Sequence, residues 1–442
     1  MRVTQAFWRL LRLEGVWVRG VTFDADRVVV RVALRRRRLV CPLCTFCTAA
    51  SEGVQAHDSV WRHLDLGVWR LEIRARLRQL RCPEHGVHVE AVPFARHRAG
   101  LTRDLDDLVA WLATKADKTT ISRLVRVDWQ TVGRVVARVC DEQLDERRLD
   151  DLFDIGIDEI AWRGGHRYLT LVTDHRRGKI VWGAEGRSAA VADRFFAELD
   201  APGEPAATEP TAAIGDIVEP DEQDRPRVGR RAARLEAISL DMGPGYARSA
   251  RQHAPQALIC IDPYHVVALA NRALDEVRRS YWNALRDSDE PTAAKRFKDA
   301  RWALLKNPED HTSRQAATLR KLRRSGGDVW RAYTLKEALR AIFDRGLSSI
   351  DAAVLIERFC SRAARSRLRP FVRLGQTIRK HAQGILAAIG THINQARVEA
   401  LNNKARLITR RAYGFHSAAA ALALIHLTCG PITLTLPHEQ IL

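Results

Sequence analysis

Four polar side chains share one helical face near the carboxyl end of the sequence. Within the stretch from Val398 to Phe415 they recur at positions i, i+3, i+4 and i+7, which places them on one side of a helix. This face has no apolar residue, so we do not expect it to pack a core. Its members are a carboxylate, two carboxamides and a guanidinium: Glu399, Asn402, Asn403 and Arg406.

Two more arginines, Arg410 and Arg411, follow this face. An acid beside amides and a basic run suits a divalent metal ion next to a phosphate backbone, because hard cations prefer oxygen ligands and guanidinium groups pair with phosphates. The simpler alternative is a solvated helix face. The chemical interpretation is favoured because aspartates upstream fit the same site.

These aspartates follow predicted strands. Asp158 ends the alternating run that begins at Phe153, and Asp241 and Asp262 each follow a short apolar strand. The strands Ala237 to Leu240 and Leu258 to Ile261 are joined by a predicted helix, which makes a βαβ unit and therefore a parallel pair. Carboxylates at the ends of such strands are placed to share metal ions.

The charge balance indicates a polyanionic partner. The chain has 442 residues, with 72 Lys and Arg against 53 Asp and Glu, a net charge of +19 and a pI of about 10.2. Such an excess favours nucleic acid. We expect a soluble, cytoplasmic protein that is not associated with a membrane, because no apolar run is long enough to span one and the first twenty residues lack a signal-peptide core.

Four metal-ligand residues lie in two short knuckles separated by a β-rich span: Cys41, Cys44, Cys82 and His85. Three thiolates and one imidazole at this spacing predict a tetrahedral structural Zn²⁺ site in a zinc ribbon. Cys47 and His88 leave the assignment open, since either residue could replace a ligand. The alternative without metal is a set of reduced, buried cysteines.

A helical block of three short helices follows, ending in a helix capped by Asp128. Val132, Val135, Val136 and Val139 give that last helix its apolar face. This pattern predicts a helix-turn-helix whose third helix enters a DNA major groove, although a plain three-helix packing module is the alternative. The polar residues expected on the outer, DNA-facing side are Gln130, Thr131, Arg134 and Arg138.

The strands after residue 150 form an antiparallel meander, and the βαβ unit follows them, which is the plan of an RNase H-like fold. An acidic, proline-containing stretch at about 196–230 indicates a loosely ordered insertion. The sequence therefore predicts a multidomain α/β protein with a zinc-binding domain (1–98), a helix-turn-helix (99–147) and the first part of an RNase H-like core (151–270). A helical insertion (271–389) and the completion of the core around the Glu399 helix (390–442) follow.

Several stretches, in order along nearly the whole chain, resemble the DDE transposases of bacterial insertion sequences, specifically the ISL3 family. They include CPLC and CPEH in the first hundred residues, GIDE at 156–159, SLDMGPGYARSA at 239–250 and CIDPYHVVALANRALDEVRR at 260–279. The others are LLKNPE at 304–309, AYTLKEALR at 332–340 and EALNNKARLITRRAYGF at 399–415.

The resemblance implies an enzyme that binds the terminal inverted repeats of an insertion sequence and then cleaves and transfers DNA strands with two Mg²⁺ (or Mn²⁺) ions. It implies a catalytic, metal-binding triad of Asp158, Asp241 and Glu399, with Asp262 as the alternative second aspartate. Asp262 and His265 resemble the D-x-x-H element of related transposases, in which Asp262 is either that second aspartate or a supporting residue. Synapsis of two element ends implies a homodimer on terminal-repeat and target DNA. A DNA-binding regulator with an inactive catalytic domain and a structure-specific nuclease are the competing functions.

Overall fold

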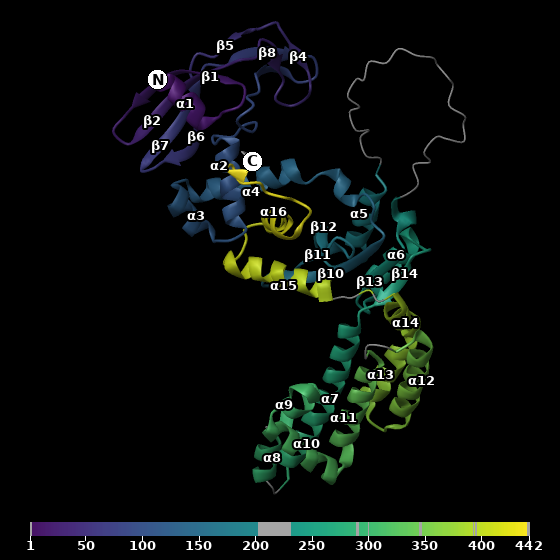
Figure 1. The fold of residues 1–442 in the computed structure, drawn as a ribbon. Coiled ribbons are helices and arrows are strands. Elements are labelled where there is room, and N and C mark those ends of the chain that lie inside the picture. Colours follow the sequence, from purple (N-terminus) through teal and green to yellow (C-terminus); the bar gives the residue numbers. More distant parts are fainter. Residues whose placement is uncertain are drawn as a thin grey trace, which may run out of the picture. The chain divides into compact units, whose positions relative to one another are not determined.

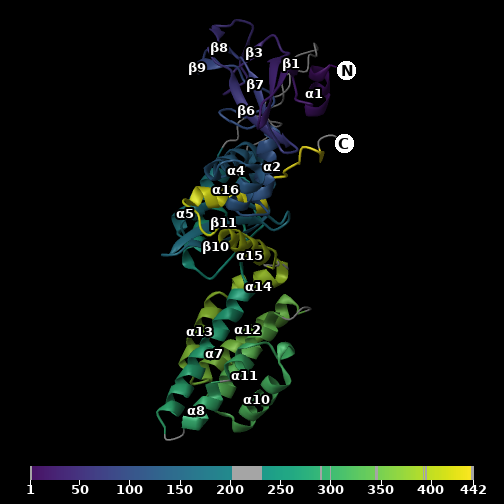
Figure 2. The ribbon, with the colours of Figure 1, turned by 90° about the vertical axis from the view of Figure 1, so that its left-hand side faces the viewer.

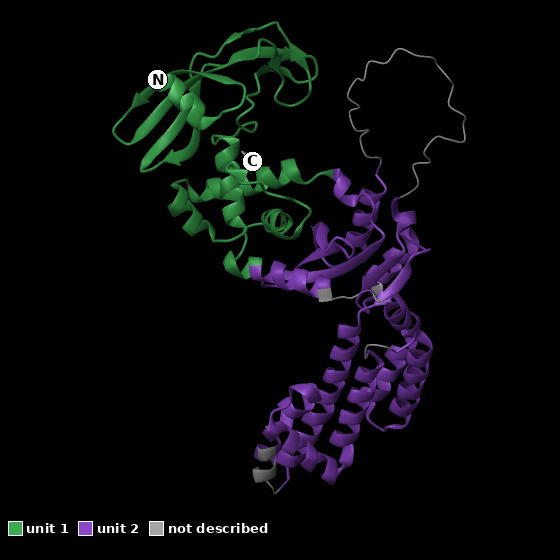
Figure 3. Cartoon of the chain, viewed as in Figure 1, with its two compact units in different colours: residues 1–145, 408–442 green, residues 146–407 purple. Residues whose placement is uncertain are grey.

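The computed structural model describes residues 2–201, 231–288, 291–298, 300–343, 347–391, 393 and 396–439. The chain forms two compact units, one made of residues 1–145 and 408–442 and the other of residues 146–407 (Figure 3). The expected domain at 390–442 is therefore divided: its last 35 residues belong with the amino-terminal unit and not with the α/β core.

The first unit begins with a four-stranded sheet, which is larger than the small zinc ribbon expected for this region. In spatial order its strands are β1 (Val16–Phe23), β2 (Arg27–Leu34), β7 (Trp69–Ala75) and β6 (Ser59–Leu66). The helix α1 (Val3–Leu11) lies against β1. Val28, Val30 and Ile73 are buried beneath the sheet, as the period-two alternation of apolar residues predicts.

Two smaller sheets carry the cysteine knuckles. Their strands are β3 (Leu39–Val40), β4 (Cys47–Thr48), β5 (Gly53–Val54), β8 (Arg78–Cys82) and β9 (Gly86–Val89). The short pairs β3–β4 and β8–β9 are antiparallel, so each knuckle lies at a tight turn or strand end. The first hundred residues thus combine a knuckle region with an independent sheet.

Three helices follow as expected: α2 (Arg103–Ala113), α3 (Lys118–Val125) and α4 (Trp129–Gln143). Asp128 caps α4, its Oδ1 accepting hydrogen bonds from the backbone amides of Gln130 and Thr131 at 2.9 and 3.3 Å. The four valines assigned to the apolar face of α4 are all buried. A further helix near the carboxyl end of the chain, α16 (Ala418–Cys429), packs on α4 and was not predicted from the sequence.

The second unit is built on a five-stranded sheet whose spatial order is β12 (Lys179–Glu185), β11 (Arg167–Asp174), β10 (Asp154–Arg163), β13 (Ala237–Leu240) and β14 (Leu258–Ile261). The first three strands are an antiparallel meander, and β10, β13 and β14 run parallel. Both the meander and the parallel pair were predicted. A short 3₁₀ helix (Glu146–Leu149) precedes β10, and another (Arg231–Arg234) precedes β13.

Helices cover both faces of this sheet (Figure 1). The helices α5 (Ala189–Leu199) and α6 (Pro244–His253) pack together, and α15 (Ala396–Arg411) lies over β10. The acidic insertion was expected to start at about residue 196. That start was wrong, because Phe196 and Leu199 are buried residues of α5. The rest of the insertion, residues 202–230, lies outside the described residues.

A helical insertion connects β14 to α15, as predicted (Figures 1 and 2). Two further 3₁₀ helices, Pro308–Asp310 and Ala341–Phe343, interrupt it. Its helices are α7 (Pro263–Arg286), α8 (Pro291–Lys298), α9 (Ala300–Leu305), α10 (Ser313–Ser325), α11 (Gly327–Arg340), α12 (Ser349–Arg365), α13 (Arg369–Lys380) and α14 (Ala382–Thr391). None of the described helices combines the length and apolar character that crossing a bilayer requires.

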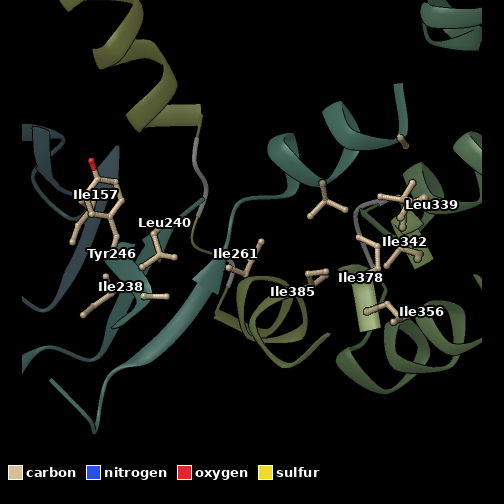
Figure 4. Packing of buried hydrophobic residues seen from close by; sticks show 14 of the residues in the cluster. Ile157, Ile238, Leu240, Tyr246, Ile261, Leu339, Ile342, Ile356, Ile378 and Ile385 are labelled. Carbon is tan, nitrogen blue, oxygen red and sulfur yellow. The ribbon is translucent and has the colours of Figure 1, made fainter. Parts of the chain in front are cut away.

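One continuous apolar core joins the sheet to the insertion (Figure 4). The contact is made by α14, whose Gly384 lies so close to β14 that a Cβ atom there would be 2.7 Å from Ile261. Ile385 lies between the sheet residue Ile261 and Ile378 of α13. Because this core is shared, the insertion is packed against the sheet and is not attached only through its two connections.

Buried Lys336 links two of the motifs quoted from the insertion, those at 304–309 and 332–340. Its ammonium group donates to the backbone carbonyls of Leu304 and Lys306, both at 3.2 Å, at the carboxyl end of α9. Those carbonyls have no intrahelical partner, so a cation there satisfies them and complements the helix dipole. The motif at 332–340 therefore caps the motif at 304–309.

Candidate functional site

The close packing of α15 on β10 depends on Gly156. A Cβ atom at this position would lie 2.9 Å from Val398 Cγ2, 3.0 Å from Ser239 Oγ and 3.1 Å from His175 Nε2. Only glycine leaves room for these neighbours. Asp158 is two residues along the same strand, so its side chain lies on the face that α15 covers.

Asn402 connects the helix to the strand. Its Nδ2 donates to Asp158 Oδ2 at 2.5 Å, and its side chain is only 1% exposed. The expected placement of Asn402 in a solvent-facing, DNA-binding row was wrong, because the side chain points into the protein. The amide oxygen Oδ1 is buried, and no described residue forms a hydrogen bond with it. Glu399 is exposed one helical turn earlier on α15, on the same side.

Asp241 lies directly after β13, the strand that pairs with β10. Its Oδ1 accepts a hydrogen bond from the backbone amide of Gly243 at 2.6 Å, which orients the carboxylate at the start of α6. A Cβ atom on Gly243 would be 2.7 Å from that oxygen, so a larger residue at this position would have to displace the carboxylate.

Asp262 lies one strand further from β10 and caps α7. Its Oδ1 accepts from the backbone amide of Tyr264 at 2.9 Å, and its Oδ2 is 3.6 Å from His265 Nε2. The D-x-x-H spacing thus brings the acid and the imidazole together on the first turn of α7. The side chain of Asp262 is buried, whereas that of His265 is half-buried.

The electrostatics bring these groups into one site. Burial raises the pKa of Asp158, and the backbone hydrogen bond from Glu159 and the charges of His265 and Arg406 oppose that rise. Burial also raises the pKa of Asp262, and the negative charges of Asp158 and Glu399 add to the rise. Acids that resist ionisation near one another are stabilised when a cation binds among them.

Two residues in the neighbourhood were not identified from the sequence. Burial and then the charge of Asp241 raise the pKa of Glu159. The hydroxyl of Tyr246 donates to Glu159 Oε2 at 3.3 Å and lies 2.8 Å from Thr170 Oγ1. Glu159 follows Asp158 on β10 and so faces the opposite side of the sheet, below the turn that carries Asp241. The acidic pair within GIDE was the available signal.

The donor set fits a hard divalent cation. Carboxylate oxygens from Asp158, Asp241 and Glu399, with the free Oδ1 of Asn402 nearby, are the ligands that Mg²⁺ and Mn²⁺ prefer. The described acids are not drawn as tightly together as a closed site, because no three of their ligand atoms lie within 4.8 Å of one another. Asp158, Asp241 and Asp262 are each held by a separate backbone hydrogen bond.

The cysteine knuckles do form a closed cluster. The ligand atoms of Cys41, Cys44, Cys82 and His85 all lie within 4.8 Å of one another. The sulfur of Cys82 is 3.6 Å from that of Cys44 and 3.4 Å from His85 Nδ1. Such a set of thiolates and one imidazole is suited to tetrahedral zinc.

The two alternative ligands lie outside this cluster. Cys47 is on β4, and Nε2 of the half-buried His88 is 2.7 Å from the carbonyl oxygen of His85. The four residues assigned from the sequence are therefore the ones that the fold brings together.

The outer side of α4 carries fewer free side chains than expected. Gln130 and Arg134 are exposed and Thr131 is half-buried. Arg138 is different: its guanidinium binds the buried carboxylate of Asp106 at 2.8 and 3.1 Å, so it holds α4 to α2. The expectation that Arg138 faces outward was wrong.

Arg406, Arg410 and Arg411 of α15, which were expected to bind DNA, differ in their contacts. Asn403 Oδ1 accepts from Arg406, and Arg410 is exposed. Arg411 donates to the backbone carbonyl of Ala113 at 3.1 Å, which anchors this end of α15 to α2 within the first unit.

Comparison with known proteins agrees with this architecture. A family model described as a transposase matches residues 155–210 and 223–425, and a model of the helix-turn-helix domain of transposase family ISL3 matches residues 90–140. The second match covers α2 to α4 and confirms the helix-turn-helix. The two matches show that the chain is a DDE transposase, an enzyme class that uses divalent metal ions on DNA.

Relatives place the chain more narrowly. The transposase for insertion sequence element IS1557 of Mycobacterium tuberculosis is 37% identical over 446 residues, covering 95% of this chain and 93% of the relative. The transposase for insertion sequence element IS1001 of Bordetella parapertussis is 27% identical over 84% of this chain and 85% of the relative. The chain belongs to the ISL3 family of transposases.

The tight packing at Gly156 predicts that Gly156→Ala impairs DNA cleavage. The added methyl group displaces α15 or costs about 1–3 kcal/mol of overpacking. Cleavage of a duplex carrying the element's end should fall at least tenfold, while circular dichroism shows a folded protein. Gly164→Ala is the control, because a Cβ atom there meets nothing within 4 Å. Equal activity of the two variants would contradict the packing argument.

The cysteine cluster predicts about one zinc ion per chain by elemental analysis. Cys82→Ser should lose the ion and lower the thermal stability, because metal binding contributes directly to folding in such small domains. Cys47→Ser should keep the ion, since Cys47 lies outside the cluster. Zinc loss in both variants, or in neither, would show that the ligand assignment is incorrect.

Proposed function

We propose that this protein binds the terminal inverted repeats of its insertion sequence and catalyses metal-dependent DNA strand cleavage and strand transfer. The observation that carries the proposal is the hydrogen bond from Asn402 to Asp158. It holds α15, which carries Glu399, over β10. This strand pairs antiparallel with β11 and parallel with β13. The sheet order, with an acid on the central strand and another after its parallel neighbour, supports an RNase H-like fold.

We assign Asp158, Asp241 and Glu399 as the ligands of two Mg²⁺ or Mn²⁺ ions. Asp241 is preferred as the second aspartate because β13 pairs directly with β10. Asp262 follows the next strand, with its Oδ1 bound to the Tyr264 amide and its Oδ2 3.6 Å from His265 Nε2. Asp262 and His265 are assigned as supporting residues that fix the start of α7 beside the site.

When bound, the two metal ions supply the activation of the attacking oxygen and the stabilisation of the leaving oxygen. The protein's own contribution is placement. Asn402 fixes the rotamer of Asp158, the Gly243 amide fixes Asp241, and Gly156 sets the distance between strand and helix. Arg406, whose charge already acts on Asp158, is placed to neutralise a phosphate at the site, with Asn403 orienting its guanidinium.

Recognition of the repeat is assigned to α4 in the first unit. The exposed Gln130 and Arg134 are free to contact base edges, and Thr131 orients Arg134 through a hydrogen bond of 2.9 Å. Arg138 is assigned to the packing of the domain, because its partner Asp106 is fully buried. The zinc cluster is assigned a structural role beside this domain.

Two chains are proposed to act together, since transposition joins two element ends at one target. We therefore expect a homodimer in the complex with DNA. The direct test is incubation of the purified protein with labelled linear duplex carrying the end of the element that encodes it, with Mg²⁺ or Mn²⁺. Nicking at the element's end supports the proposal. Specific binding without any cleavage would support the competing DNA-binding regulator.

The triad predicts that Asp158→Asn and Glu399→Gln abolish cleavage while binding to repeat DNA stays close to wild type. Each substitution removes charge from the metal site and changes little volume. Gel-shift and cleavage assays on the same preparations separate the two effects. Asp241→Asn and Asp262→Asn, compared in the same assay, decide the second aspartate: a dead Asp262 variant beside an active Asp241 variant would reverse our assignment.

The recognition helix predicts a loss of discrimination. Arg134→Ala or Gln130→Ala should reduce the preference for the terminal repeat over scrambled duplex by about 1–3 kcal/mol, because a base contact is lost. Arg410→Ala should weaken binding to both duplexes alike if it contacts a phosphate. Titration of both duplexes gives the preference directly. Equal losses on both for the α4 variants would show that this helix positions the protein without sequence readout.

A further inference from the structure

The positive charge of the chain is concentrated in the helical insertion. Residues 271–389 contain 26 Lys and Arg against 13 Asp and Glu, a net charge of +13 out of +19 for the whole chain. The first 98 residues carry a further net charge of +9 (18 arginines against 9 acids), whereas the helix-turn-helix and the acidic site add little. A polyanion attracted by this net positive charge would therefore be expected to contact the insertion.

One face of α12 exposes three arginines in a row. Arg358, Arg362 and Arg365 lie at i, i+4 and i+7, and all three are exposed. In the part of the chain that the structure describes, none of them forms an ion pair or a hydrogen bond. We call these three residues the α12 arginine face.

The neighbouring helix shows the contrasting case. Arg373 of α13 binds Glu276 at 2.7 and 2.9 Å, and Arg379 binds Glu357 at 3.2 Å. Both arginines are exposed, as are those of α12, but their charges are already matched. Glu357 lies next to Arg358 in sequence and still pairs across to α13, so the α12 arginine face is left without an acid.

We propose that the α12 arginine face binds the phosphate backbone of duplex DNA outside the terminal repeat, without reading its sequence. The proposal rests on the proposed function, which supplies duplex DNA as the substrate. Residues 358 to 365 span roughly 10 Å along the helix axis, at about 1.5 Å per residue. One DNA strand presents a phosphate about every 3.4 Å, so three guanidinium groups can each reach one.

The same face continues toward Ile350 and Val354, which are 79% and 46% exposed. A protein partner would use that apolar half, whereas DNA uses the basic half. We favour DNA because the net charge of the insertion opposes contact with a second copy of itself. The alternative, a dimer contact, is an outcome of the experiment below.

The experiment measures binding of full-length protein to a random duplex by fluorescence anisotropy at several salt concentrations. The double variant Arg358→Ala/Arg362→Ala should lose two phosphate contacts and lower the salt slope by about 1.8. Wild type should then lose roughly tenfold more affinity between 50 and 200 mM salt than the variant. Arg373→Ala/Arg379→Ala is the matched control, because it removes the same charge from paired residues and should keep the wild-type slope.

Three duplexes distinguish the sources of the DNA. The repeat alone should bind the α12 variant as tightly as wild type; a repeat with flanking DNA or a separate random duplex should bind it more weakly, and whichever shows the loss is the segment that α12 contacts. Equal slopes for the α12 and control variants would overturn the proposal, and so would a changed oligomeric state with unchanged DNA binding. Failure of wild type to bind the repeat would instead refute the proposed function.

Discussion

The approach of α15 to β10 is the contact on which the catalytic arrangement depends. Glu399 is on a helix separated from Asp158 by more than two hundred residues, and the hydrogen bond from Asn402 is the direct polar link between them. That bond forms only because Gly156 lets Val398 pack against the strand, and because Arg397 donates to the His175 carbonyl at 3.1 Å. Burial lowers the pKa of His175 to about 4, so the ring is neutral and can share a hydrogen bond with Ser239 beneath the helix. These contacts together position α15 beside Asp158, although only Asn402 among them contacts the Asp158 carboxylate.

The long insertion has to leave that arrangement intact. It departs from Asp262 and returns just before α15, so any movement of its ends would move both Asp262 and Glu399. Packing of α14 onto β14 prevents this, because Gly384 allows the helix to sit directly on Ile261. Within the insertion, Lys336 ties α11 to the end of α9. An enzyme core interrupted by eight helices thus keeps its geometry because the interruption shares its hydrophobic core.

Local patterns made most of the fold predictable. The strands around Asp241 and Asp262 are short apolar runs bounded by turn residues, so their limits were predicted residue for residue. The four residues of the cysteine cluster follow from knuckle spacing in the same way. Long-range packing was not accessible: Asn402 and Arg138 have the polarity of solvent-facing residues, and only the fold reveals that each satisfies a distant acid. The position of α16 on α4 has the same cause, since nothing in an alanine- and leucine-rich helix identifies its partner.

Pairing, more than the number of arginines, distinguishes the basic surfaces of this chain. Arg138 and Arg411 are occupied in holding helices together, and Arg373 and Arg379 are matched by glutamates. Exposed cations that no acid neutralises carry the release of counterions that drives binding to DNA. On α4 they are adjacent to a glutamine that can read bases, which suits recognition of a defined end. On α12 they are accompanied by no such group, which suits DNA of any sequence. A transposase needs both kinds of surface, because the element's end is fixed and the DNA beyond it is not.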